Sequence, residues 1–266
     1  MTDHYLTVQD VIDKIIAAIP GEPREDTVDN IKTGKPGQKV TGIVTTFLAT
    51  LQVLQKTVEL GANLVITHEP TFYNHLDEQE WLKDDPVYEA KRRFIEEHQL
   101  AIWRFHDYWH RHNPDGVLTG TLKRLGWEDY VDPLDPTICV IPSIPLSELV
   151  PVIKEKLGVQ TARIMGDPNF ICQRVAVLVG AWGGRTQILT LGRDDVDTLV
   201  CGEIAEWETT EYVRDATQMG RPKALVVVGH ANSEEPGMEY LVEWLQKRLP
   251  NIPIHHLATG NPFWYG

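Results

Sequence analysis

The sequence is poor in the features that mark secreted, membrane-spanning or nucleic-acid-binding proteins. It has three widely spaced cysteines, so neither a disulfide framework nor a Cys-x-x-Cys zinc site is indicated. No apolar run approaches the roughly 20 residues of a membrane span, and the amino-terminal residues lack the features of a secretory signal. The net charge of −13 argues against nucleic acid as a partner, because phosphate binding requires a basic face. We therefore expect a cytoplasmic protein that acts on a small-molecule substrate.

What the chain does have is a recurring pattern of metal-ligand residues directly after short apolar runs. The runs at 64–67, 101–105 and 224–229 lead into the pairs His68 and Glu69, His106 and His110, and His230 and Glu234. Short β-branched runs are typical of buried strands in a parallel sheet, and ligands bind beyond the carboxyl ends of such strands. The pattern predicts that the six side chains converge on one or two divalent transition-metal ions. Imidazole and carboxylate without thiolate favour zinc, iron or manganese.

The spacing within each pair limits how it can hold an ion. The second and third pairs each consist of residues four apart, which share a face on a helix, whereas the adjacent residues of the first pair splay apart. Structural alternatives stay open: His110 can be a solvated surface group, and Glu234 can be favoured by the dipole of a helix start. Glu203, after the apolar run at 198–201, can be a general base, a supporting group or merely structural. Four further histidines are assigned to structure or surface: His75, His98, His255 and His256.

The order of the elements predicts an α/β fold with two lobes, in which mixed or parallel sheets are covered by helices. Helices are expected at 7–19, 48–60, 78–97 with a break near Pro86, 116–125, 146–157, 204–217 and 238–249. Strands are expected at 40–45, 64–67, 101–105, 138–141, 162–165, 174–179, 198–201, 224–228 and 252–257. Residues 21–39 are expected to form a loop, and 180–184 a glycine-rich turn. A proline-rich boundary follows residue 131. We expect a discontinuous metal-binding lobe of 1–131 and 222–266, with an α/β lobe of 132–221 inserted into it.

At these motifs the sequence resembles the Nif-three-like dinuclear-metal-centre family, some members of which are described as GTP cyclohydrolase I type 2 proteins. The resemblance is carried by Gly61–Pro70, His106–His110, Cys201–Ile204, Val228–Glu234 and Asn261–Phe263, in the family's order. It implies a two-lobed α/β subunit in a ring-like hexamer, with metal sites facing an internal cavity. His68, His106, His230 and Glu234 match family ligands directly.

Two positions depart from the family pattern. Glu69 stands where the family has a second histidine, and His110 stands where it has an aspartate. Both exchanges keep a metal-ligand residue. A carboxylate can bridge two cations, whereas a neutral imidazole normally cannot. A single ion, or two unequal ions, therefore stays open beside the dinuclear centre that the resemblance implies.

Three functions are consistent with these patterns. The first is a metal-dependent hydrolase, in which the metal lowers the pKa of water from about 15.7 toward about 7 and Glu203 shuttles a proton. Its substrate is unknown, and GTP cyclohydrolase-like activity is implied only by the resemblance. The second is a non-catalytic metal-binding, regulatory or interaction protein. The third is a nucleotide-binding α/β protein without metal, which requires the three ligand pairs to be coincidental.

Overall fold

The sheets and helices form two units, each with its own β-sheet, as the predicted two-lobed α/β fold requires. The computed structural model describes residues 5–264. The first unit comprises the described part of Met1–Gly116 together with Met238–Thr259. The second comprises Val117–Gly237 together with the described part of Gly260–Gly266. Among the described residues, no helix is long and apolar enough to cross a membrane.

The first unit is built on a five-stranded sheet in the order β1-β4-β3-β2-β11. The strands are β1 (Ile31–Thr33), β2 (Ile43–Thr46), β3 (Leu64–Thr67), β4 (Ala101–Arg104) and β11 (Ile254–His256). Strands β11, β2, β3 and β4 run parallel, whereas β1 pairs antiparallel with β4. Every residue of β2, β3 and β4 is buried. Burial on both faces explains why these strands are nearly continuous apolar and β-branched runs rather than alternating ones.

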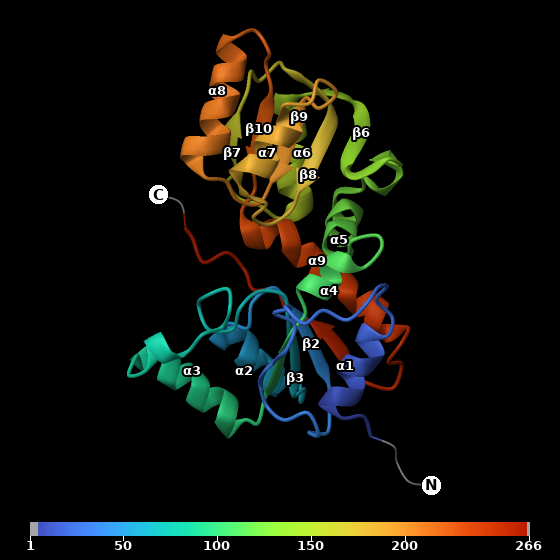
Figure 1. Ribbon diagram of the computed structural model, residues 1–266, viewed down its shortest axis with the longest axis vertical. Helices are drawn as coiled ribbons and strands as arrows, with labels where there is room; N and C mark the ends of the chain where they lie inside the picture. Colours follow the sequence, from blue (N-terminus) through green and yellow to red (C-terminus); the bar gives the residue numbers. More distant parts are fainter. Residues whose placement is uncertain (1–4, 265–266) are drawn as a thin grey trace. The chain divides into compact units, whose positions relative to one another are not determined.

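Helices lie on both faces of this sheet. They are α1 (Val8–Ile16), α2 (Leu51–Glu59), the 3₁₀ helix η1 (Glu80–Leu82), α3 (Pro86–Glu97) and α4 (Asp107–Arg111). Helices α2 and α3 lie on one side of β2 and β3, and α1 lies on the other (Figure 1). Leu54 of α2 and Ile95 of α3 belong to one core cluster with residues of β3 and β4. Side-chain caps on the first turns of α1, α2 and α3 explain where these helices begin: Thr7, Thr50 and Asp85.

An aromatic stack anchors the short helix α4. The rings of Trp103 and Phe105 stack with centroids 4.8 Å apart, and Phe105 lies 5.6 Å from Trp109 of α4. The Trp109 ring in turn lies 6.0 Å from Tyr240 and 5.5 Å from Trp244, in the part of α9 (His230–Gln246) that belongs to the first unit. Trp103 and Trp109 are fully or almost fully buried. Because large aromatic side chains bury much apolar area, this packing stabilises a helix too short to form alone.

The second unit contains a six-stranded sheet in the order β5-β6-β8-β9-β10-β7. Its strands are β5 (Val131–Asp132), β6 (Asp135–Pro145), β7 (Arg163–Met165), β8 (Ile171–Leu178), β9 (Thr198–Cys201) and β10 (Ala224–Val227). Strands β8, β9 and β10 are parallel and form the centre of the sheet. Strands β6 and β7 flank them as antiparallel neighbours. This mixed sheet places the carboxyl ends of β9 and β10 at one edge.

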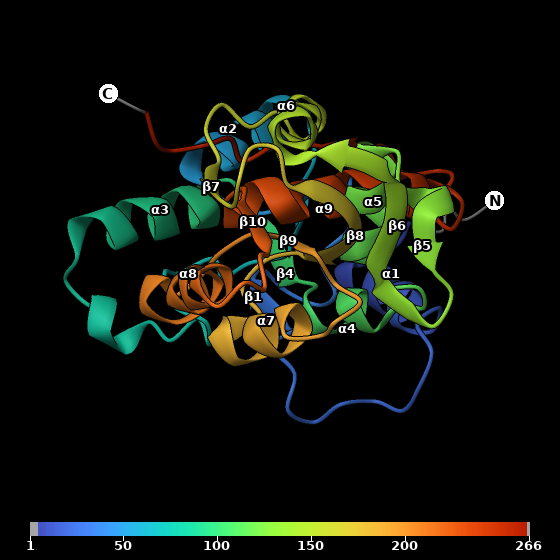
Figure 2. The ribbon, with the colours of Figure 1, turned by 90° about the horizontal axis from the view of Figure 1, so that it is seen from above.

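Helices again cover both faces of the second sheet. They are α5 (Gly116–Leu125), the 3₁₀ helix η2 (Glu128–Tyr130), α6 (Leu146–Leu157), α7 (Gly183–Leu191), the π-helix η3 (Glu206–Thr210) and α8 (Glu211–Gln218). Figure 2 shows α6 on one side of β8 and β9, with α7 and α8 on the other. Leu191 of α7 and Val213 of α8 pack into one core cluster with strand residues. The chain thus buries two separate apolar cores.

The expected bounds of the lobes differ from these units. Strand β10 pairs with β9 and β7, so residues 224–227 lie in the second sheet, whereas the expected first lobe includes 222–266. The second unit also includes residues 117–131, which were assigned to the first lobe. An apolar run identifies a buried strand but not its partner strand, because any parallel neighbour can bury it. His230 and Glu234 therefore lie in the second unit.

Three local elements also differ from the expectation. Strand β1 lies within residues 21–39, which were expected to form a loop. Helix α7 follows the glycine-rich turn, and α9 begins at His230 rather than at 238. Proline and glycine lower helix propensity, but Pro236 and Gly237 lie inside α9 in the structure.

Candidate metal centre

The candidate ligands of the first unit follow two neighbouring parallel strands. His68 and Glu69 come directly after β3, and His106 follows β4 as the N-cap residue of α4. The strands are in register at their ends, with Thr67 opposite Arg104. His110 lies four residues after His106 and hence one turn along α4. The sheet therefore brings these side chains to one edge, where ligands bind in open α/β sheets.

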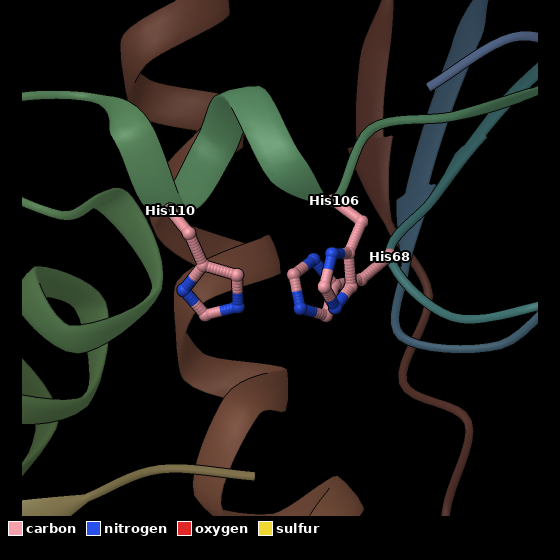
Figure 3. A group of neighbouring side chains, drawn as sticks. All are labelled: His68, His106 and His110. Carbon is pink, nitrogen blue, oxygen red and sulfur yellow. The ribbon is translucent and has the colours of Figure 1, made fainter. Parts of the chain in front are cut away.

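Three imidazole rings meet at this edge. The ring centroids of His68 and His106 are 4.5 Å apart and stacked, and His110 lies 5.0 Å from each of them. One ring nitrogen from each histidine lies within 4.8 Å of the others, so the set can hold a metal ion. Figure 3 shows the rings turned toward the same space from the end of β3 and from both ends of α4. We call His68, His106 and His110 the histidine triad.

Each ring of the triad is oriented by an oxygen atom at Nδ1. His68 Nδ1 lies 3.3 Å from the Phe105 carbonyl oxygen, His106 Nδ1 lies 2.9 Å from Asp107 Oδ1, and His110 Nδ1 lies 2.9 Å from Asp115 Oδ2. With Nδ1 donating to the oxygen, the lone pair of each neutral ring is on Nε2. Oxygen acceptors on the second nitrogen are the usual partners of metal-binding histidines, whose orientation they fix.

The protonation of the triad suits metal binding. Burial, together with the nearby rings of His106 and His110, lowers the pKa of His68 well below its ordinary value. Burial and His110 lower the pKa of His106 to about 4. Both rings are neutral at pH 7, and only neutral imidazole offers the lone pair that a metal requires.

A loop that precedes the sheet holds the start of α4. Both carboxylate oxygens of Asp29 accept hydrogen bonds from three consecutive backbone N–H groups, those of His106, Asp107 and Tyr108, at 2.8 to 2.9 Å. Asp107 is held in turn through its Oδ2, to which the Thr27 hydroxyl donates. Partial burial of the Asp29 carboxylate removes water from it and raises its pKa. The loop thus positions two of the triad's three rings.

Glu69 lies beside the triad, next to a buried arginine. Its Oε1 is 3.6 Å from His106 Nε2, and its Oε2 accepts a hydrogen bond from Arg104 Nη2 at 3.1 Å. Arg104 is the last residue of β4 and is completely buried. A carboxylate and a guanidinium therefore accompany the three rings.

The second unit carries its own cluster at the carboxyl ends of β9 and β10. His230, the first residue of α9, has Nδ1 3.0 Å from Glu203 Oε1 and Nε2 3.0 Å from Glu234 Oε2. Glu234 is buried, whereas 56% of the Glu203 side chain is exposed. Gly180 makes room for this group, since a Cβ there would lie 2.0 Å from Glu234 Oε1. His230 and Glu234 share a helix face, as the spacing of four predicts.

Within each unit the structure brings predicted residues together. His68, Glu69, His106 and His110 lie together in the first unit, and Glu203, His230 and Glu234 lie together in the second. That all six ligands share one centre stays a prediction. The three cysteines take no part in either set: they are buried in β6, β8 and β9, and burial raises the pKa of Cys139 and Cys201 to about 12.

Several supporting residues were missed from the sequence. Asp107 and Asp115 flank the candidate histidines, and a carboxylate near a metal-type histidine is a usable signal. Arg104 is a charged residue inside an otherwise apolar run, which indicates a buried ion pair. His75 was assigned to structure or surface, yet its ring lies 6.0 Å from that of His106. Asp29 carries no local signal, because its role depends on a contact across 77 residues of chain.

Proteins of known sequence and structure resemble this chain over most of its length. A GTP cyclohydrolase 1 type 2 homolog of Clostridium perfringens is 24% identical over 257 residues, covering 92% of this chain and 93% of the relative. A hypothetical protein of Staphylococcus aureus has a TM-score of 0.78 at 18% identity and covers 98% of this chain and 100% of its own. A Bacillus cereus protein related to NIF3 has a TM-score of 0.77 at 16% identity, covering 99% and 100%. The Duf34/NIF3 (NGG1p interacting factor 3) family model matches residues 6–262, and the chain belongs to this family.

Proposed function

We propose that this protein is a metal-dependent hydrolase whose metal is held by the histidine triad. The observation that carries the proposal is the orientation of the three rings. Each has Nδ1 beside an oxygen atom, and one nitrogen of each lies within 4.8 Å of the other two. Rings oriented in advance lose little freedom on binding an ion, which supports tight binding.

The donor set fits a divalent transition metal. Neutral imidazole and carboxylate suit zinc, iron and manganese, and the thiols lie elsewhere. When bound, such an ion supplies a Lewis acid that makes water a competent nucleophile near neutral pH. The protein's part is to orient the three rings, through the carbonyl of Phe105 and the carboxylates of Asp107 and Asp115, and to keep His68 and His106 neutral by burial.

The second set completes the proposed chemistry. We assign His230 and Glu234 as further metal ligands and Glu203 as the group that moves a proton. Glu203 Oε1 is 3.0 Å from His230 Nδ1, and its side chain reaches solvent, so it can accept a proton and release it to water. A group that is both partnered and exposed suits a shuttle better than a buried ligand.

The identity of the substrate is proposed from the relatives. The Clostridium perfringens relative is described as a GTP cyclohydrolase 1 type 2 homolog, so the hydrolytic opening of a purine nucleotide is the first activity to test. A ring-like homohexamer is the proposed assembly, measurable by light scattering after size-exclusion chromatography. The free thiols Cys139, Cys172 and Cys201 support a reducing location such as the cytoplasm.

Elemental analysis of the untagged protein tests the metal proposal directly. The wild type is compared with His68→Ala and His230→Ala, and with His98→Ala as a control at an exposed histidine. We expect a bound transition metal in the wild type and the control, and its loss in His68→Ala. Loss in His230→Ala as well supports His230 as a metal ligand.

Activity is then measured on the metal-loaded protein with GTP. Turnover that disappears with His68→Ala, together with the metal, supports the hydrolase. Stable metal binding without turnover of GTP or of a generic phosphate ester favours the non-catalytic metal-binding or interaction protein instead. A wild type that takes up no zinc, manganese or ferrous iron contradicts both.

A further inference from the structure

Glu69 forms an ion pair with the buried Arg104 beside the histidine triad. Arg104 Nη2 donates to Glu69 Oε2 at 3.1 Å, and Arg104 Nε donates to the His68 carbonyl oxygen at 3.0 Å. Arg104 is completely buried, and the Glu69 side chain is 13% exposed. The guanidinium is therefore a permanent positive charge inside the candidate centre, because arginine does not lose its proton in proteins.

The guanidinium is also fixed in place from its other side. Its Nη1 donates to the carbonyl oxygen of His75, in the segment that follows Glu69. Asp77 anchors that segment, since it accepts a hydrogen bond from the Phe72 N–H at 2.8 Å and pairs with the buried Lys32 at 3.2 Å. Asp77 has a positive φ of 56°, a conformation that surrounding contacts must maintain. Three hydrogen bonds thus fix the Arg104 guanidinium, one each to the His68 carbonyl, the His75 carbonyl and the Glu69 carboxylate.

The two oxygens of Glu69 consequently face different partners. Oε2 receives the guanidinium, and Oε1 lies 3.6 Å from His106 Nε2, on the side of the triad. A carboxylate that bridges two cations gives one oxygen to each of them. Here the Arg104 cation already takes one of those places, and like charges repel strongly where water is excluded.

We infer that the triad takes a single metal ion, and that Arg104 occupies the place of a second cation at Glu69. Glu69 gives the ion Oε1 at most. This rests on the proposed metal function and deepens it, because the resemblance implies a dinuclear centre. This explains why the chain has Glu69 where the family has a histidine. The buried Arg104 needs a negative partner, and a neutral imidazole could not neutralise the guanidinium.

Manganese loading followed by electron paramagnetic resonance tests this inference without any substrate. The full-length wild type is titrated with Mn²⁺, its stoichiometry is measured by elemental analysis, and its spectrum is recorded. We expect no exchange coupling, with the hyperfine lines of an isolated ion. A coupled pair of ions in the wild type overturns the inference and leaves the metal proposal intact. Absence of any bound metal instead contradicts the metal proposal itself.

Variants at the ion pair test the role of Arg104. Arg104→Met removes the positive charge beside Glu69 Oε2, and we expect the bound manganese to rise by about one equivalent and become exchange-coupled. Arg92→Met is the matched control, because Arg92 forms ion pairs at the exposed surface with Glu89 and Glu96. Unchanged stoichiometry in a folded Arg104→Met protein shows that the guanidinium does not exclude a second ion, and contradicts the inference.

A second variant keeps the test decisive if Arg104→Met does not fold. Glu69→Gln retains an oxygen acceptor for Arg104 but removes the charge that could attract an ion. We expect metal affinity to fall by no more than about tenfold, with an uncoupled spectrum as in the wild type. Two exchange-coupled manganese ions in a Glu69→Gln protein of normal circular dichroism would contradict the inference, because Arg104 is still in place there.

Discussion

The two histidine-containing sets differ in how firmly their rings are held. In the first unit, His68 is completely buried. The carboxylates of Asp107 and Asp115 orient the rings of His106 and His110, respectively. In the second unit, His230 begins a helix, and its Nδ1 partner Glu203 is mostly exposed. Water competes for an exposed carboxylate, so its hold on the ring is weaker.

This difference indicates that the two sets have different functions. A set of rings that each have a positioned oxygen partner, one of them completely buried, can hold an ion in one geometry. A histidine whose Nδ1 partner is an exposed carboxylate can change its contacts more easily. We therefore expect metal affinity to depend mainly on the first set and proton movement mainly on the second.

The largest expected effect is the loss of metal in His68→Ala. Removing a fully buried ring deletes one ligand and leaves a cavity between His106 and His110, so affinity should fall by more than about a hundredfold. His230→Ala should lose less, because its ring is less firmly held. Competition with a chromogenic chelator measures both affinities. Equal losses would remove the distinction between the sets.

A buried lysine gives the first unit a pH-dependent stability. Burial lowers the pKa of Lys91 to about 8, and its ammonium donates to the Thr71 carbonyl oxygen at 2.6 Å. An unfolded lysine titrates near 10.4, so between about pH 8 and 10 the unfolded chain binds more protons. The unfolding free energy should therefore rise with pH in this window, by at most about 3 kcal/mol.

Urea denaturation of the wild type and Lys91→Met at several pH values measures this effect. The rise in unfolding free energy between about pH 8 and 10 should be much smaller in Lys91→Met than in the wild type, whatever the absolute stability of the variant. Lys56→Met, on the surface of α2, is the control and should retain the gain. Parallel curves for the wild type and Lys91→Met would show that Lys91 does not cause it.

Removal of the carboxylate partners should weaken metal binding by a smaller amount. Asp115→Asn and Asp107→Asn leave all ligands in place but alter the acceptor on Nδ1, and such changes typically cost about 10- to 100-fold in affinity. Glu203→Gln should cost less than about tenfold, because its side chain is mostly exposed. The same chelator competition ranks the three variants. A Glu203→Gln loss as large as that of Asp115→Asn would contradict the comparison.

The smallest effect concerns the loop that holds α4. Asp29→Ala leaves three backbone N–H groups without their carboxylate, which should cost about 1 to 3 kcal/mol of unfolding free energy. Asp26→Ala, three residues earlier with a side chain 84% exposed, is the matched control and should be nearly neutral. Thermal denaturation distinguishes them. Similar melting temperatures for the wild type and Asp29→Ala would show that the loop does not stabilise the helix.

Part of this architecture was predictable because local chemistry determines it. The apolar runs before His68, His106 and His230 are buried strands in the structure, since such runs cannot remain in water. The spacing of four in two of the ligand pairs correctly indicated shared helix faces. Thr7 caps its helix, because the hydroxyl satisfies an otherwise unpaired N–H group.

Other features depended on contacts between distant segments. The assignment of β10 to the second sheet, the antiparallel pairing of β1 with β4, and the clamp of Asp29 on α4 have no local signature. Each depends on which of several similar strands or backbone groups the segment contacts in the folded chain, and the local sequence does not specify that partner.

The sequence by itself indicated the type of chemistry, because histidine and carboxylate side chains directly after buried parallel strands are the residue types that can bind a metal at a sheet edge. Only the tertiary structure decided how these side chains are arranged. It brings three rings together in the first unit, provides an oxygen for each Nδ1, and places the Arg104 cation against Glu69. The physical reason is that hydrophobic periodicity specifies which face of an element is buried, whereas orientation and charge balance depend on neighbours far along the chain.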